Sequence, residues 1–238
     1  DQSTGSAGTG PEGFVQQTTV NRVFNIHKPV GWTSFDVVRW LKGRLRMSRV
    51  GHAGTLDPFA DGVLLVCAGQ ATRQVPALMS AEKEYVAELQ LGIETDTLDV
   101  TGQVVSQNAV PGFSRADLEL VLASFIGTIR QIPPRFSALK KDGQRYYDLA
   151  RHGDDREPEA RTVTITELVL LEHSLDQLQL RIVCSKGVYI RSLLRDIAHA
   201  LHTAGFVRML RRTRIGDYHI SHSLRLDDAT SWITGETS

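Results

Sequence analysis

The sequence predicts a single α+β domain, and three observations lead to this prediction. Segments with strand patterns and segments with helical periodicity are mixed irregularly, unlike the strict alternation of a doubly wound sheet. The chain has 238 residues, 41% of them hydrophobic, which is enough to bury a sizeable core. It contains no repeat and no evident linker. We therefore assign residues 20–238 to one domain and interpret residues 1–19, rich in Gly, Ser and Thr, as a disordered tail or a cloning remnant.

Strands are predicted where apolar and polar residues alternate, or where a short apolar run lies between turn residues. The clearest example is KEYVAELQLG at residues 83–92, and the turn-rich segment 94–105 is expected to carry a short returning strand. The other predicted strands cover residues 23–29, 62–69, 161–173, 177–186 and 206–220.

Helices are predicted from apolar spacings of three and four and from N-capping residues. The first is capped by Thr33 or Ser34, and its apolar face consists of Phe35, Val38, Leu41 and Leu45. A second, over residues 71–80, is weakened in its middle by Pro76. The remaining predicted helices cover residues 114–127, 145–153, 189–203 and 226–235.

The formal net charge is zero, but the basic residues are unevenly distributed. Residues 128–145 contain two prolines, no periodicity and many basic side chains, which is typical of a long functional loop. A second basic stretch, residues 186–225, contains Lys186, Arg191, Arg195, Arg208, Arg211, Arg212, Arg214 and Arg225. Such a distribution can give a neutral protein one positive face for RNA, although charged side chains also simply keep a surface solvated.

Two cysteines, Cys67 and Cys184, each lie in an apolar strand-like run, which indicates buried free thiols. The sequence has no metal-ligand spacing, no glycine-rich phosphate loop and no nucleophile elbow. It also lacks a signal peptide and an apolar run long enough to cross a membrane. We therefore expect a cytoplasmic protein that uses no cofactor and no metal.

The segment GHAGTLDPFADG, residues 51–62, holds Asp57 in a stiff turn just before an apolar strand. Asp-Pro pairs and glycines are common in turns, so turn formation alone could explain this composition. The alternative is a carboxylate presented on a rigid platform for chemistry. Together with an aromatic residue on a strand and an arginine-rich half, such a carboxylate could act on an unpaired base.

Five segments together resemble the TruB family of tRNA pseudouridine synthases, in the order found there. They are HKPVGWTS, GHAGTLDPFADGVLLV, KEYVAELQLGIETDTLD, IPPRFSALKKDGQRYYDLARHG and CSKGVYIRSLLRDIA. The resemblance runs from about Val23 to about Asp228. It implies the pseudouridine synthase fold over residues 20–238, with a mixed, largely antiparallel central sheet flanked by helices and loops.

The resemblance also implies an activity, the isomerisation of uridine 55 in the TΨC loop of tRNA without a cofactor. Asp57 matches the family's catalytic aspartate, Tyr85 its active-site tyrosine and Arg191 the arginine that pairs with the aspartate. Asp57 could attack C6 of the base or C1′ of the sugar, or assist a glycal route, and the sequence does not choose among these.

Five further positions match substrate-binding or supporting residues of the family: His52, Lys28, Asp99, Tyr189 and Leu210. The resemblance implies that His52 enters the RNA loop when the base leaves its stack, and that Lys28 supports the catalytic loop or a phosphate. It implies that Asp99 extends the ion network, while the other two form pocket walls. For each, a plain structural role in a turn, surface or core is the alternative.

Three departures from the family pattern accompany this resemblance. His27 replaces the usual aspartate before the Lys-Pro pair, and Phe136 replaces a tyrosine. The chain also ends soon after Asp228 without the PUA-type RNA-binding domain of many relatives, so we expect a monomer that grips tRNA weakly with its catalytic domain alone. A non-catalytic RNA-binding protein and an aspartate-dependent hydrolase remain the rival interpretations.

Overall fold

The computed structural model describes residues 20–137, 140–141, 144–145, 158–228 and 231. Its centre is a nine-stranded sheet with the order β1-β3-β12-β4-β11-β10-β7, with β2 beside β3 and β13 beside β12. Among the described strands, only β12 and β3 pair in parallel, so the sheet is mixed and largely antiparallel. This arrangement confirms the predicted α+β class.

The sheet strands follow the hydrophobic pattern of the sequence. β4 alternates buried and half-buried residues along its whole length, as a strand with one face in the core requires. The bounds of the sheet strands are β1 Arg22–Lys28, β2 Val50–His52, β3 Asp61–Ala68, β4 Lys83–Leu91, β7 Gly127–Gln131, β10 Arg161–His173, β11 Gln177–Cys184, β12 Gly205–Ile215 and β13 Tyr218–His219. Two small hairpins are formed by β5 Ile93–Thr95 with β6 Val104–Gln107 and by β8 Lys140–Lys141 with β9 Gln144–Arg145.

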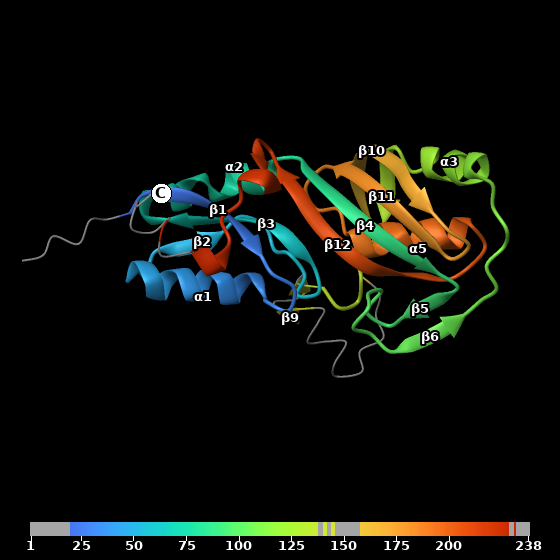
Figure 1. The fold of residues 1–238 in the computed structure, drawn as a ribbon, viewed down its shortest axis with the longest axis horizontal. Coiled ribbons are helices and arrows are strands. Elements are labelled where there is room, and N and C mark those ends of the chain that lie inside the picture. The colour runs from blue at the N-terminus through green and yellow to red at the C-terminus, as the bar shows by residue number, and fades with distance from the viewer. Residues whose placement is uncertain (1–19, 138–139, 142–143, 146–157, 229–230, 232–238) are drawn as a thin grey trace, which may run out of the picture.

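Helices cover the sheet at two places (Figure 1). α1 (Ser34–Leu45) packs on β1 and β3, whereas α3 (Arg115–Ala123) and α5 (Ile190–Ala200) pack on the half of the sheet that contains β4, β10, β11 and β12. The remaining helical segments are α2 (Val75–Ser80), η1 (Gly69–Gln74), η2 (Ile220–His222) and η3 (Leu226–Asp228). Cys67 and Cys184 are buried free thiols, as predicted. No helix of the described part of the chain is long and apolar enough to cross a membrane.

The first helix differs from the prediction in the face that it buries. Thr33 is the N-cap, with a full capping box to Asp36. Val38 and Leu41 are buried as expected, but Phe35 is 63% exposed. The helix is rotated because Ser34 is buried and exchanges hydrogen bonds with the backbone of Leu56.

Other differences concern local boundaries. Residues 71–80 are not one helix, because the chain forms 3-10 turns first and Pro76 then lies at the start of α2, where proline is tolerated. The predicted loop 128–145 begins instead as strand β7, whose partner β10 supplies the ladder. The predicted helix 145–153 and most of the predicted helix 226–235 lie outside the described residues.

Candidate active site

Asp57 lies in the loop between β2 and β3, and this loop is fixed by its own backbone. The Ala60 N–H donates to the Asp57 carbonyl at 3.0 Å, and the Gly31 N–H donates to the Pro58 carbonyl at 2.8 Å. Gly54 has a φ of +100°, a conformation that favours glycine. The glycines and the proline therefore form a rigid turn, and that turn carries Asp57.

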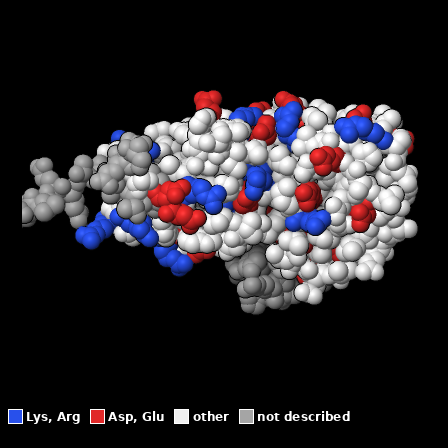
Figure 2. Space-filling view, in the orientation of Figure 1, with Lys and Arg blue, Asp and Glu red and all other residues white. Residues whose placement is uncertain are grey.

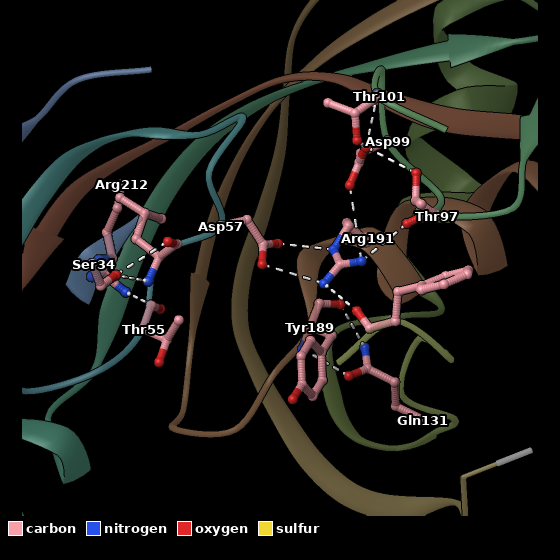
Figure 3. A network of polar contacts seen from close by, with 12 residues as sticks. Ser34, Thr55, Asp57, Thr97, Asp99, Thr101, Gln131, Tyr189, Arg191 and Arg212 are labelled. Atoms are coloured by element: carbon pink, nitrogen blue, oxygen red, sulfur yellow. Dashed lines mark hydrogen bonds and ion pairs between the residues drawn. The ribbon is translucent and has the colours of Figure 1, made fainter. Parts of the chain in front are cut away.

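The Asp57 carboxylate faces the guanidinium of Arg191 at the start of α5 (Figure 3). Arg191 Nε donates to Asp57 Oδ2 at 2.8 Å and Nη2 donates to Oδ1 at 3.3 Å. The Arg191 side chain is 6% exposed and that of Asp57 is 29% exposed. This fork orients the carboxylate while leaving part of it open to a ligand.

Arg191 is itself held from behind by three groups (Figure 3). Its Nη1 donates to the Thr97 carbonyl at 3.0 Å and lies 3.9 Å from Asp99 Oδ2. Its Nη2 donates to the Phe136 carbonyl at 3.1 Å. Because that last contact uses the backbone, a phenylalanine at this position preserves it.

Asp99 supports this network and is too buried to lie on a substrate surface. It is 5% exposed, and its Oδ1 accepts hydrogen bonds from the Thr97 hydroxyl at 2.9 Å and from the Thr101 hydroxyl at 2.5 Å. The expectation that Asp99 extends the ion network agrees with this geometry. A direct contact with substrate does not.

Of the two roles expected for Lys28, support of the catalytic loop agrees with the structure and direct contact with a phosphate does not. It has no exposed surface, and its Nζ donates to the carbonyls of Trp32 and Ala60, both at 2.6 Å. Burial lowers the pKa of Lys28 to about 8. Lys28 therefore supports the Asp57 loop from beneath and cannot reach an RNA phosphate in this structure.

Arg212 is a functional residue that the sequence interpretation missed. It is 2% exposed, and it donates to the carbonyls of Val63 at 2.8 Å, Thr55 at 3.2 Å and Gly54 at 3.1 Å. These bonds tie the Asp57 loop to β12. A signal was present in the sequence, because Arg212 follows Leu210 by two positions on a strand and so shares its inward face.

The C-terminal end of the Asp57 loop is held by contacts of Asp61 with Arg211 and His27. Arg211 donates to Asp61 in a fork, at 2.9 Å from Nε and 2.7 Å from Nη2, and His27 Nε2 lies 3.2 Å from Asp61 Oδ2. Burial acts to raise the pKa of Asp61, but these hydrogen bonds outweigh it and lower the pKa. His27 thus has a carboxylate partner in this chain.

Tyr85 and Leu210 lie together in the main hydrophobic core, beside Leu56 of the Asp57 loop. They are 8% and 5% exposed, respectively. Burial raises the pKa of the Tyr85 hydroxyl, which keeps it protonated at neutral pH. Leu210 packs as a core residue, and the stacking role of Tyr85 stays a prediction.

Tyr189 and His52 are both half-buried. The Tyr189 ring lies 4.7 Å from the Arg161 guanidinium, and its backbone exchanges two hydrogen bonds with the Gln131 side chain. His52 has a buried Nδ1 without a partner among the described residues. Burial and the nearby charge of Arg212 lower the pKa of His52, which favours its neutral form.

No group of three or more His, Cys, Asp or Glu that could hold a metal ion occurs among the described residues. A cavity of about 450 Å³ is bordered by Thr95, Leu98 and Phe136 among others. The charged groups that the structure brings together at this site are the Asp57 carboxylate and the Arg191 guanidinium, with Asp99 on the other side of Arg191.

Comparison with known proteins identifies the family to which this site belongs. Residues 42–190 match the family model described as TruB family pseudouridylate synthase, N terminal domain. The chain is 42% identical over 217 residues to the tRNA pseudouridine synthase B of Phocaeicola vulgatus, covering 89% of this chain and 92% of that protein. The chain belongs to the TruB family.

Other TruB relatives and solved structures agree with this assignment. The tRNA pseudouridine synthase B of Francisella philomiragia is 46% identical over 210 residues, which cover 88% of this chain and 70% of that protein. The fold is similar to a chain in the crystal structure of a Cbf5-Nop10-Gar1 complex, with a TM-score of 0.70 and 31% identity over 91% of this chain and 56% of that chain. A chain from an H/ACA RNP bound to a substrate RNA containing 2′-deoxyuridine gives a TM-score of 0.68 and 29% identity, over 93% of this chain and 56% of that one.

Proposed function

We propose that this TruB chain converts a uridine in the TΨC loop of tRNA into pseudouridine, with Asp57 as the nucleophile. The observation that carries the proposal is the forked contact between the partly open Asp57 carboxylate and the buried Arg191 guanidinium. The names of the curated relatives support the reaction and the tRNA substrate. We further propose that residues 20–238 act as one cytoplasmic, monomeric catalytic domain.

The chemistry breaks the bond between N1 of the uracil and C1′ of the ribose and forms a bond from C5 to C1′. A proton leaves C5 and N1 gains one, so the reaction is balanced without a cofactor. Arg191 fixes the direction of the Asp57 carboxylate, and Asp99 fixes Arg191. We propose that Tyr85 provides the ring against which the flipped base packs.

This constellation favours catalysis over the two rivals. A protein that only binds RNA needs a basic surface, but it has no need to brace a partly exposed carboxylate with a buried arginine. A hydrolase would use a second carboxylate or a metal to activate water. The second carboxylate near Asp57 is that of Asp99, which already accepts hydrogen bonds from Thr97 and Thr101 and forms an ion pair with Arg191.

The proposal is tested with unmodified tRNA transcript that carries tritium at uracil C5. Wild type and the exposed-carboxylate control Asp217→Asn should release tritium and modify the TΨC loop, whereas Asp57→Asn should release none but still bind the transcript. Tritium release by Asp57→Asn at the wild-type rate would refute the role of Asp57. Binding without release by all three proteins would leave the RNA-binding interpretation.

A further inference from the structure

A basic surface lies beside the candidate active site, on α1 and the segment after it. Between Asp36 and Asp57 the sequence contains basic side chains but no Asp or Glu. The basic residues, which we call the α1 basic surface, are Arg39, Lys42, Arg44, Arg46 and Arg49. All are exposed except Lys42, which is half-buried. Figure 2 shows several Lys and Arg at the end of the molecule where α1 lies, with a group of Asp and Glu beside them.

Two of these arginines are held against aromatic rings on the same helix. The Arg39 guanidinium lies 5.9 Å from the centre of the Phe35 ring, and that of Arg44 lies 5.1 Å from the Trp40 ring. Such contacts restrict the arginine side chains, so less entropy is lost when they bind an anion. Each guanidinium occupies one face of its ring, which holds the arginine at the surface of the helix.

Helix α1, which carries the first three residues of the α1 basic surface, begins directly at the catalytic loop, and Arg39 lies about one and a half turns into the helix. Ser34 at the start of α1 exchanges hydrogen bonds with the backbone of Leu56, next to Asp57. A recess of about 410 Å³ lies at this end of the helix and is bordered by Trp32 and Trp40 among others. The helix has 12 residues and therefore extends about 18 Å from the loop.

Neighbouring acids, namely Asp36 on α1 and the exposed Asp227 and Asp228 on η3, neutralise only part of this surface. Asp36 pairs with Arg39 at 2.7 Å, which removes one positive charge of the set. On η3, which packs near β1, the carboxylate of Asp227 lies 3.7 Å from Arg225. Within the described residues, the α1 basic surface therefore keeps a positive balance.

We infer that the α1 basic surface binds the phosphate backbone of the base-paired stem that continues from the loop whose uridine reaches Asp57. The inference rests on the proposed function. It is supported by the positive charge, by the two arginines held at aromatic rings and by the position of α1 at the catalytic loop. Phosphate contacts of this kind fix the register of a nucleic acid without reading its sequence.

The test uses two double variants with matched side chains. Arg39→Gln/Arg44→Gln removes two exposed arginines of the α1 basic surface, one of them in an i,i+3 ion pair. The control Arg22→Gln/Arg115→Gln removes two exposed arginines outside the α1 basic surface and outside both basic stretches of the sequence, one of them over an aromatic ring and the other in an i,i+4 ion pair. Thermal unfolding of both variants establishes that each is folded.

Binding is measured for two hairpins with the same TΨC loop and stems of about 3 and about 12 base pairs, over a range of salt concentrations. The α1 variant should bind the long hairpin roughly tenfold more weakly than wild type, with a salt slope lower by about one to two, because Asp36 already neutralises part of the charge of Arg39. Its affinity for the short hairpin, and both affinities of the control, should change less than about twofold.

Two results would overturn the inference. One is an α1 variant that binds the long hairpin as wild type does. The other is a loss of affinity that is equal for the two stems or equal to that of the control. Failure of the proposed function is distinguishable, because it would appear as wild type that binds the long hairpin but releases no tritium from it.

Discussion

Replacing Arg212 with lysine tests whether the Asp57 loop depends on its attachment to β12. Arg212 is buried and makes three hydrogen bonds to loop and strand carbonyls. A lysine keeps the charge but can reach about one of the three, and each lost bond from a charged donor costs about 1.5–3 kcal/mol. Two lost bonds therefore predict a free energy of unfolding lower by about 3–6 kcal/mol.

The activity of Arg212→Lys should fall as well, because the released carbonyls belong to Gly54 and Thr55, just before Asp57. A displacement of about 1 Å of the nucleophile can lower kcat about a hundredfold. Urea unfolding and tritium release measure the two effects, with Arg211→Lys as the exposed neighbouring control, expected to cost about 1 kcal/mol or less. Unfolding of Arg212→Lys within about 1 kcal/mol of wild type, with full activity, would refute this reasoning.

Three further predictions concern the supports of the same loop. Gly62→Ala should destabilise the fold by about 3 kcal/mol or more in urea unfolding. The Cβ of an alanine at this position would lie 2.2 Å from the Arg212 carbonyl oxygen, and the residue has a φ of +110°. A urea midpoint equal to that of wild type would contradict this tight packing. His27→Asp should lower the midpoint of thermal unfolding, because it places a second carboxylate against Asp61. Added salt should recover part of this loss. A midpoint that is unchanged or higher in His27→Asp would contradict the prediction. Lys28→Met should unfold more easily than wild type at pH 7. The pKa of Lys28 is about 8 in the folded state rather than the ordinary 10.5, so the free energy of unfolding of wild type should rise relative to that of Lys28→Met between pH 8 and pH 10.5. A difference that stays constant or falls over this pH range would contradict the lowered pKa.

Much of the fold could be predicted from the sequence because local patterns decided it. β4 alternates as KEYVAELQLG predicts, and α5 buries the apolar positions that its spacing gives. Phe35 was predicted wrongly because the rotation of α1 is set by the hydrogen bonds of Ser34 to Leu56, which the helical periodicity does not contain. β7 was missed because its ladder depends on β10, about thirty residues later.

The candidate site was predictable only where a family resemblance named its residues. Asp57 and Arg191 are 134 positions apart, and no local pattern relates them. The family resemblance assigned Lys28 to the support of the catalytic loop or to a phosphate, and the four backbone carbonyls around its amine agree with the first of these roles. Arg212 was grouped with the other basic residues, although its strand position placed it in the core.

The short parallel contact between β3 and β12 has a consequence for how the protein forms during synthesis. It pairs Asp61 and Gly62 with Arg211 and Arg212, so the Asp57 loop is completed by a strand made about 150 residues later. A growing chain that stops short of β12 holds the nucleophile but lacks its supports. Contacts of such long sequence separation form slowly. The Asp57 loop is therefore fully supported only after β12 has been synthesised and has paired with β3. Until then, the incomplete chain is not able to catalyse the reaction.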